Sequence, residues 1–128
     1  MTIAPMLYSI GAMALGESWG EVELEPEVEA WLLGLDDETF GQARFHIDLL
    51  AERGVHLGEP HTRQLRGKLR ELRIDRWRIT YFIAPGRRIV LLTVFLKRQR
   101  RERAEIDRAE QAMVRCIEEH VRTDRTEG

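Results

Sequence analysis

Cysteine, lysine and long apolar runs are what this 128-residue sequence has least of. Its single cysteine, Cys116, cannot form an internal disulfide, which suits a reducing compartment such as the cytoplasm. No segment approaches the length of a membrane span, and the apolar N-terminus lacks the basic residues of a secretory signal. The sequence has no His/Cys or Asp/Glu cluster with metal-ligand spacing, no glycine-rich phosphate loop and no Ser-His-Asp set. We therefore expect a cytoplasmic domain that uses no metal and no other cofactor.

The net charge of −2 conceals a strong asymmetry along the chain. Residues 66–103 hold thirteen Lys and Arg against three acids, a formal charge of +10, whereas residues 1–65 carry −9 and residues 104–128 carry −3. One interpretation is a solvated basic face that acidic helices neutralise within the molecule. The other is an anion-binding surface, which we favour because these cations occupy predicted strands and strand ends that must lie close together.

The basic segment also has the strongest strand signals. Residues 71–74 alternate polar and apolar, and residues 77–83 place aromatic and branched side chains on one side. Residues 84–87 contain Pro and Gly and predict a turn. Residues 89–96 are almost continuously apolar, which is typical of a strand buried on both faces. Together these segments predict a three-stranded antiparallel meander.

Other elements surround this meander. Residues 20–25 alternate and predict a short first strand, after which Pro26 suits the first turn of a helix. Asp36 or Asp37 caps a second helix that ends at Gly54, so the two helices form a hairpin. Residues 55–67 are expected to be a loop, and a last helix is expected over 101–122. This order predicts an α+β fold in which an antiparallel sheet packs against a helical hairpin and a C-terminal helix.

The domain boundaries follow from the same patterns. We expect an N-terminal extension over residues 1–18, one folded domain over 19–122 and a flexible tail over 123–128. Met113 and Cys116 fall on the apolar stripe of the last helix, and we interpret both as core residues.

Several short motifs in this order resemble a known family: Leu65–Arg66–Gly67, Glu71–Leu72–Arg73, residues 77–82, residues 89–92 and residues 95–98. In combination, over residues 19–116, they resemble the RelE/HigB toxins of bacterial type II toxin–antitoxin systems, in particular the phage-derived HigB-like branch. The resemblance implies a RelE-like microbial RNase fold. It also implies a toxin that inhibits translation by cutting mRNA on the 70S ribosome, as a ribosome-dependent endoribonuclease.

The resemblance further implies a partner and a set of site residues. A cognate antitoxin, in this branch usually a helix-turn-helix protein encoded by the neighbouring gene, would neutralise the toxin, and DNA would be met only through that antitoxin. Arg78, Lys97 and Arg98 match the family positions that carry the phosphate chemistry. Lys68 and Arg73 lie where further basic residues of the family contact RNA. The basic segment adds three more candidate RNA-binding residues, Arg66, Arg100 and Arg101.

Cleavage of RNA by its own 2′-hydroxyl needs a proton acceptor, cations around the charged phosphorane and a proton donor for the leaving oxygen. Arginine suits the second task, and a lysine among cations can lose its proton and act as the base, which favours Lys97. The alternatives are that Lys97 is a strand-end charge reaching water and that Arg78 pairs with Glu71 or Asp75. His56 or His61 could also reach the cleft as an acid or base.

Aromatic side chains alternate with the arginines of the basic segment. Phe82 shares a side of its strand with Arg78, so we expect it to stack on a base of the RNA. Trp77 and Tyr81 share the other side with Ile79, so we interpret these two as core residues.

Two other functions remain open. One is a non-catalytic module of the same fold that binds RNA, ribosome or antitoxin; the absence of the tyrosine that RelE-type members carry near Ala104 favours it. The other is a structural protein whose basic face docks an acidic partner.

Overall fold

Residues 18–98 and 102–127 are described by a computed structural model of the chain. Apart from Ser18, the expected N-terminal extension lies outside the described residues. Within the described ranges, no helix combines the length and the apolar character needed to cross a membrane.

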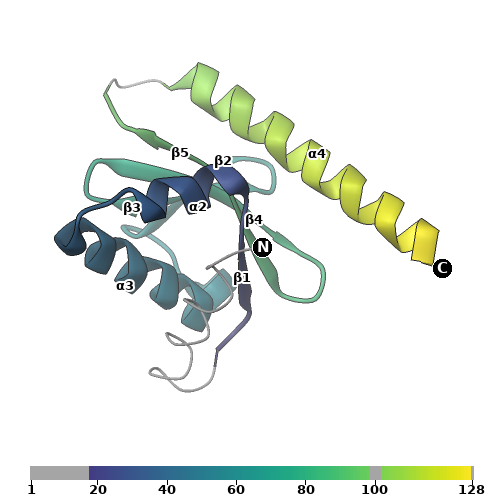
Figure 1. Ribbon diagram of the computed structural model, residues 1–128, viewed down its shortest axis with the longest axis horizontal. Coiled ribbons are helices and arrows are strands. Elements are labelled where there is room, and N and C mark those ends of the chain that lie inside the picture. The colour runs from purple at the N-terminus through teal and green to yellow at the C-terminus, as the bar shows by residue number, and fades with distance from the viewer. Residues whose placement is uncertain (1–17, 99–101, 128) are drawn as a thin grey trace.

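One five-stranded sheet, with strand order β1-β5-β4-β3-β2, forms the centre of the fold (Figure 1). Its strands are β1 (Glu21–Leu24), β2 (Thr62–Arg66), β3 (Leu69–Ile74), β4 (Trp77–Ala84) and β5 (Arg88–Leu96). The α+β class is confirmed, but the sheet is mixed because β1 pairs in parallel with β5. Parallel pairing is possible here because the helices and the other strands form a long connection between β1 and β5.

The region expected to be a loop, residues 55–67, contains strand β2. The meander therefore has four strands, β2 to β5, and the expectation of three was wrong. Residues 62–66 show no clean alternation, and the pairing of β2 with β3 shifts register between Gln64 and Arg66. Pairing with β3, and not a local pattern, makes this segment a strand.

Helices cover both faces of the sheet. On one face lie α2 (Pro26–Leu33), α3 (Asp37–Arg53) and the short 3-10 turn η1 (Gly54–His56), and on the other lies α4 (Arg103–Glu127). The run over 89–96 supplies both cores: Ile89 and Leu91 pack under the helical hairpin, and Val90 and Leu92 pack under α4. The expectation that this strand is buried on both faces is confirmed.

The helix ends show where the sequence signals were correct. Asp36 caps α3 by accepting a hydrogen bond from the backbone N–H of Thr39, and Gly54 follows the last residue of the helix.

Met113 of α4 is buried against the sheet, and the half-buried Cys116 packs beside it, where burial raises the pKa of its thiol. Helix α4 continues to Glu127, beyond the expected end at residue 122, and its second half extends past the sheet (Figure 1).

A bulge in β5 decides which way the end of that strand faces. Thr80 pairs with Thr93 while Tyr81 pairs with Leu91, so Leu92 is an extra residue in β5. A shift of one residue reverses the alternation of all side chains beyond it. Leu92 and Thr93 therefore both face α4, whereas Val94 packs against the core under the helical hairpin.

Candidate functional site: a basic cleft on the sheet

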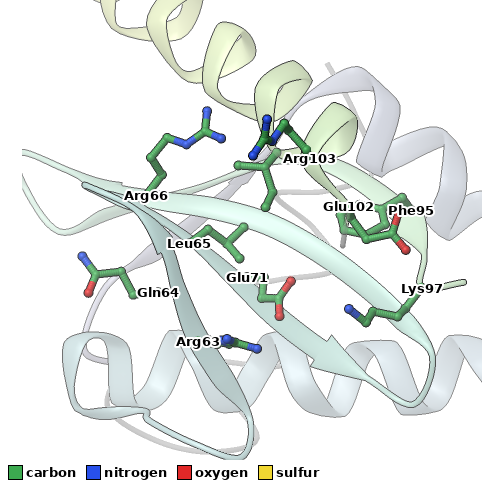
Figure 2. Close-up of a pocket in the computed structure, with 10 residues that line it drawn as sticks. Arg63, Gln64, Leu65, Arg66, Glu71, Phe95, Lys97, Glu102 and Arg103 are labelled. Carbon is green, nitrogen blue, oxygen red and sulfur yellow. The ribbon is translucent and has the colours of Figure 1, made fainter. Parts of the chain in front are cut away.

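A cleft of about 270 Å³ opens on the α4 side of the sheet, where β2, β3 and the end of β5 meet the start of α4 (Figure 2). We call it the basic cleft. Its lining residues are Arg63, Gln64, Leu65, Arg66, Glu71, Phe95, Lys97, Glu102, Arg103 and Ile106. Four of them are cations and two are carboxylates, which come from segments far apart in the sequence.

Strand register aligns the polar residues of the cleft. Arg63 of β2 lies opposite Glu71 of β3, and Glu71 lies opposite Thr80 of β4. Residues directly opposite one another share a face of the sheet, so these side chains form one row. In the next row, Arg73 lies opposite Arg78, and Arg78 lies opposite Phe95.

The bulge in β5 brings Lys97 to this face. The backbone N–H of Lys97 donates to the carbonyl of Arg76 at 2.8 Å, so the end of β5 lies beside the start of β4, as the sequence predicts for Lys97 and Arg78. Counted past Leu92, Phe95 and Lys97 face the same way as Arg78. Without the extra residue, Lys97 would project on the opposite side of the sheet.

Glu71 lines the cleft and lies beside Arg73 and Arg78. Its Oε2 atom is 3.2 Å from Nε of Arg73 and 3.8 Å from Nε of Arg78. Only 6% of Glu71 is exposed. Figure 2 shows Arg63 and Lys97 approaching this carboxylate from two sides. Four cations from four strands or strand ends thus gather around one acid.

Arg78 is held more firmly than the sequence indicates. Its Nη1 donates to the carbonyls of Asp75 and Trp77 at 2.8 and 2.9 Å, and only 13% of its side chain is exposed. Burial lowers the pKa of Arg78, and the nearby Glu71 opposes that shift. The alternative pairing of Arg78 with Glu71 is therefore present. The Nε atom is buried and makes no hydrogen bond within the described part of the chain.

The other predicted cations divide into four groups. Arg66 reaches the α4 end of the cleft but donates to Asp107 and Glu110 of α4, and these hydrogen bonds raise its pKa. Lys68 lies in the turn between β2 and β3, outside the cleft and at the opposite end of β3 from Arg73. Arg98 is exposed just beyond Lys97. Arg100 and Arg101 lie outside the described residues.

The neutralised basic face, the first interpretation of the charge asymmetry, is present in part. Beside the Arg66 pairs, Arg88 forms a two-pronged ion pair with Glu23 of β1, at 2.8 and 2.9 Å. Arg108 joins Glu27 of α2 to α4, and these hydrogen bonds raise the pKa of Arg108. These pairs lie along the sheet edges and α4, whereas Arg63 and Lys97 line the cleft and Arg73 pairs with Glu71 beside it.

Phe82 cannot stack on RNA as expected. It is 2% exposed and packs with Leu69 and Val90 in the core under α4. It does share a face with Arg78, but α4 covers that half of the face and leaves only the half near the start of β4 open. Tyr81, 1% exposed, and Trp77, packed against Trp31, belong to the opposite core as predicted.

The histidine expectation finds no support in the geometry. Neither His56, exposed on η1, nor His61 is among the described residues that line the cleft. His61 instead lies near His46 of α3, with 6.0 Å between ring centroids. Sequence reasoning missed Arg63, because a loop was expected where its strand lies, and treated Glu71 only as a counter-charge. The alternation around Glu71 was the signal that could have placed it on the cleft face.

Comparisons with known proteins bear on the fold and the family of the chain. Residues 30–114 match the family described as phage derived protein Gp49-like (DUF891). The crystal structure of the archaeal RelE–RelB complex from Pyrococcus horikoshii OT3 contains a chain that superimposes with a TM-score of 0.54 and 20% identity. That match covers 64% of this chain and 98% of the archaeal one. A comparison with curated protein sequences finds no match. The resemblance found in the sequence is thereby confirmed: the chain belongs to the phage-derived Gp49-like family and has the fold of RelE.

Proposed function

We propose that this protein is the toxin of a type II toxin–antitoxin pair and acts as a ribosome-dependent, metal-independent mRNA endoribonuclease. The observation that carries the proposal is the gathering of Arg63, Arg73, Arg78 and Lys97 around one point of the sheet face. Family membership and the RelE fold support the same function.

The cleft has the groups that phosphate chemistry needs. Arg73 is 30% exposed at its side chain and can bring a charge-assisted hydrogen bond to a phosphate oxygen. Lys97 adds a second cation just after the end of β5, and Arg63 adds a third from β2. Such preorganised donors stabilise the extra negative charge of a phosphorane more than that of the ground-state phosphate.

Partners follow from the same proposal. The archaeal relative was crystallised as a RelE–RelB complex, so we propose that a cognate antitoxin binds this chain as well. A helix-turn-helix antitoxin encoded by the neighbouring gene is the expected form, with DNA contacted only through it. The toxin would act in the cytoplasm, on mRNA in the 70S ribosome.

Controlled induction tests the proposal. Protein synthesis should stop after induction of the chain and continue when the neighbouring gene is induced with it. The purified protein should cut mRNA on translating ribosomes, with the cuts mapped by primer extension. Intact mRNA in that assay, at toxin concentrations that saturate the ribosomes, would contradict the endoribonuclease activity.

A non-catalytic binding module is the second candidate, and one observation favours it. Arg78 is tied to Glu71 and to two backbone carbonyls, which limits its freedom to follow a phosphate into the transition state. Such a module would bind ribosomes or RNA with the same salt dependence but leave the mRNA uncut. The same purified assay separates the two functions, because binding and cleavage are measured on one sample.

A further inference from the structure

A nearly buried carboxylate in the middle of a cation cluster is the feature of this cleft that phosphate binding alone does not explain. Glu71 is 6% exposed, and its Oε2 lies 3.2 Å from Arg73 and 3.8 Å from Arg78. Like charges repel, so an ionised glutamate at this place weakens the attraction of the cleft for the phosphates of RNA. A surface that only had to hold RNA would be better without it.

Chemistry gives the carboxylate a use. Transfer of the 2′-hydroxyl proton requires a group that can accept it. Arginine stays protonated in proteins, and a lysine has only donors in its ammonium form, so neither accepts a proton as a cation. No histidine is among the described cleft-lining residues, whose two carboxylates are Glu71 and Glu102. Glu102 lies at the rim, where it accepts the backbone N–H of Arg98 at 3.0 Å.

We infer that Glu71 is the proton acceptor of the cleavage reaction, an inference that rests on the proposed function. The 2′-oxygen bonds to the adjacent phosphorus as its proton passes to Glu71. The bond from phosphorus to the 5′-oxygen breaks, and that oxygen takes a proton from the ammonium group of Lys97. The products are a 2′,3′-cyclic phosphate and a 5′-hydroxyl. Solvent returns the proton to Lys97 and removes the one on Glu71.

The positions of the surrounding groups suit this step. In RNA the attacking hydroxyl and the phosphate are on neighbouring carbons of one ribose, so the acceptor and the phosphate donors must be close neighbours. Glu71 meets that requirement, with Arg73 in hydrogen-bond contact and Arg78 just beyond it. The buried Nε of Arg78, without a hydrogen bond among the described residues, is a donor that a phosphate oxygen could satisfy.

The test compares Glu71→Gln with the parent in single-turnover cleavage of mRNA on translating ribosomes, over a range of pH. Glutamine keeps the shape and an oxygen for Arg73 but cannot take the proton. Removal of a general base typically slows a reaction by about 10²–10⁴-fold. We expect that loss, together with disappearance of the acidic ionisation from the pH–rate profile. RNA affinity, measured separately, should stay the same or rise because a negative charge has gone.

Three controls make the result decisive. Glu38→Gln makes the same charge change on the exposed first turn of α3 and should cleave like the parent. Glu102→Gln tests the other carboxylate, and an abolished reaction there with normal cleavage by Glu71→Gln would overturn the inference. Thermal melting shows whether each variant is folded.

Lys97→Arg decides the question even if Glu71→Gln does not fold. Arginine keeps the positive charge but does not give up its proton, so Lys97→Arg removes a lysine acid and a lysine base alike. With Lys97 as the donor and Glu71 as the acceptor, this variant should cleave ordinary mRNA at least about 10²-fold more slowly, but it should recover on an mRNA whose scissile 5′-oxygen is replaced by sulfur, because a thiolate leaves without a proton. Failure of Lys97→Arg to recover on the 5′-sulfur mRNA would assign the base to Lys97 and overturn the inference. If the parent itself never cleaves mRNA, the proposed function fails instead, so the two failures are distinguishable.

Discussion

Replacing Arg78 and Lys97 by alanine should separate the stability of the domain from its chemistry. Both cations face the cleft, but they are held differently. Arg78 is 13% exposed at its side chain and satisfies two backbone carbonyls, whereas Lys97 is half-buried at the strand end. Loss of Arg78 should therefore lower the stability of the domain more than loss of Lys97.

The magnitudes follow from these contacts. Arg78→Ala leaves the carbonyls of Asp75 and Trp77 without their donor and leaves buried Glu71 with one cation fewer. The first of these hydrogen bonds is exposed and the second is half-buried, so losing each costs about 0.5–1.5 kcal/mol, the usual net value of a hydrogen bond. A domain of this size usually unfolds with a free energy of roughly 5–15 kcal/mol, so the variant should still fold, with a melting temperature several degrees lower. Lys97→Ala should change the unfolding free energy by about 0.5 kcal/mol or less.

The cleavage rate should fall strongly in both variants, including Lys97→Ala, whose stability should hardly change. Loss of one preorganised donor typically slows the chemical step by about 10²–10³-fold, so each variant should lose at least that much cleavage. Their affinity for RNA should fall by only about 1 kcal/mol, because each is one of several phosphate contacts. Thermal melting by circular dichroism, filter binding to RNA and cleavage on translating ribosomes measure the three quantities on the same preparations.

The chain offers a matched control because Lys68 and Lys97 are its only two lysines. Lys68→Ala removes the same charge outside the cleft and should leave the cleavage rate within a few-fold of the parent. Equal rate losses in the two lysine variants would show that the total charge matters and not the cleft. Full activity in Lys97→Ala would refute its role in the chemical step, and an unchanged melting temperature in Arg78→Ala would refute the stabilising role of its hydrogen bonds.

Three further predictions concern binding, packing and pH. RNA affinity should fall steeply with salt, with a log–log slope of several units because each phosphate neutralised on a single strand contributes about 0.7; a slope near zero, measured by filter binding, would mean that the cations are neutralised internally. Gly54→Ala should lower the melting temperature markedly, because the new Cβ would lie 2.1 Å from the Trp19 ring at a φ of +52°, whereas the control Gly41→Ala, at an open and exposed helical site, should keep or raise it. Burial alone would raise the pKa of Glu27, but its hydrogen bonds to Arg108 and to a backbone N–H lower it below the usual 4.5. A carboxyl group whose pKa is lower in the folded than in the unfolded chain stabilises the fold at pH values above its unfolded pKa. Glu27→Gln should therefore have a lower free energy of unfolding than the parent at pH 7. The difference between the two free energies, measured in denaturant melts, should shrink as the pH falls below about 4.

Local patterns in the sequence were sufficient for much of the fold. Alternation over residues 71–74 and 77–83, the Pro–Gly turn after them and the apolar run over 89–96 predicted β3, β4 and β5 close to their observed bounds. Asp36 and Gly54 marked the ends of α3 because capping and left-handed backbone conformations restrict which residues fit. The meander also placed Arg78 beside Lys97, since antiparallel neighbours bring the start of one strand to the end of the next. The motifs of β3 to β5 were enough to suggest the RelE-like fold.

Tertiary structure alone decided how these residues form a site. Strand β2, which carries Arg63, forms because it pairs with the free edge of β3, and no periodicity in residues 62–66 predicts it. The extra Leu92 in β5 turns Lys97 onto the face of Arg78, and the run over residues 89–96 conceals such a bulge because nearly every position in it is apolar. Helix α4 covers Phe82 but not Glu71. Side-chain alternation along one strand is a local property and can be read from the sequence. Which half of a face remains open, and which strand edge finds a partner, depend on packing between distant segments.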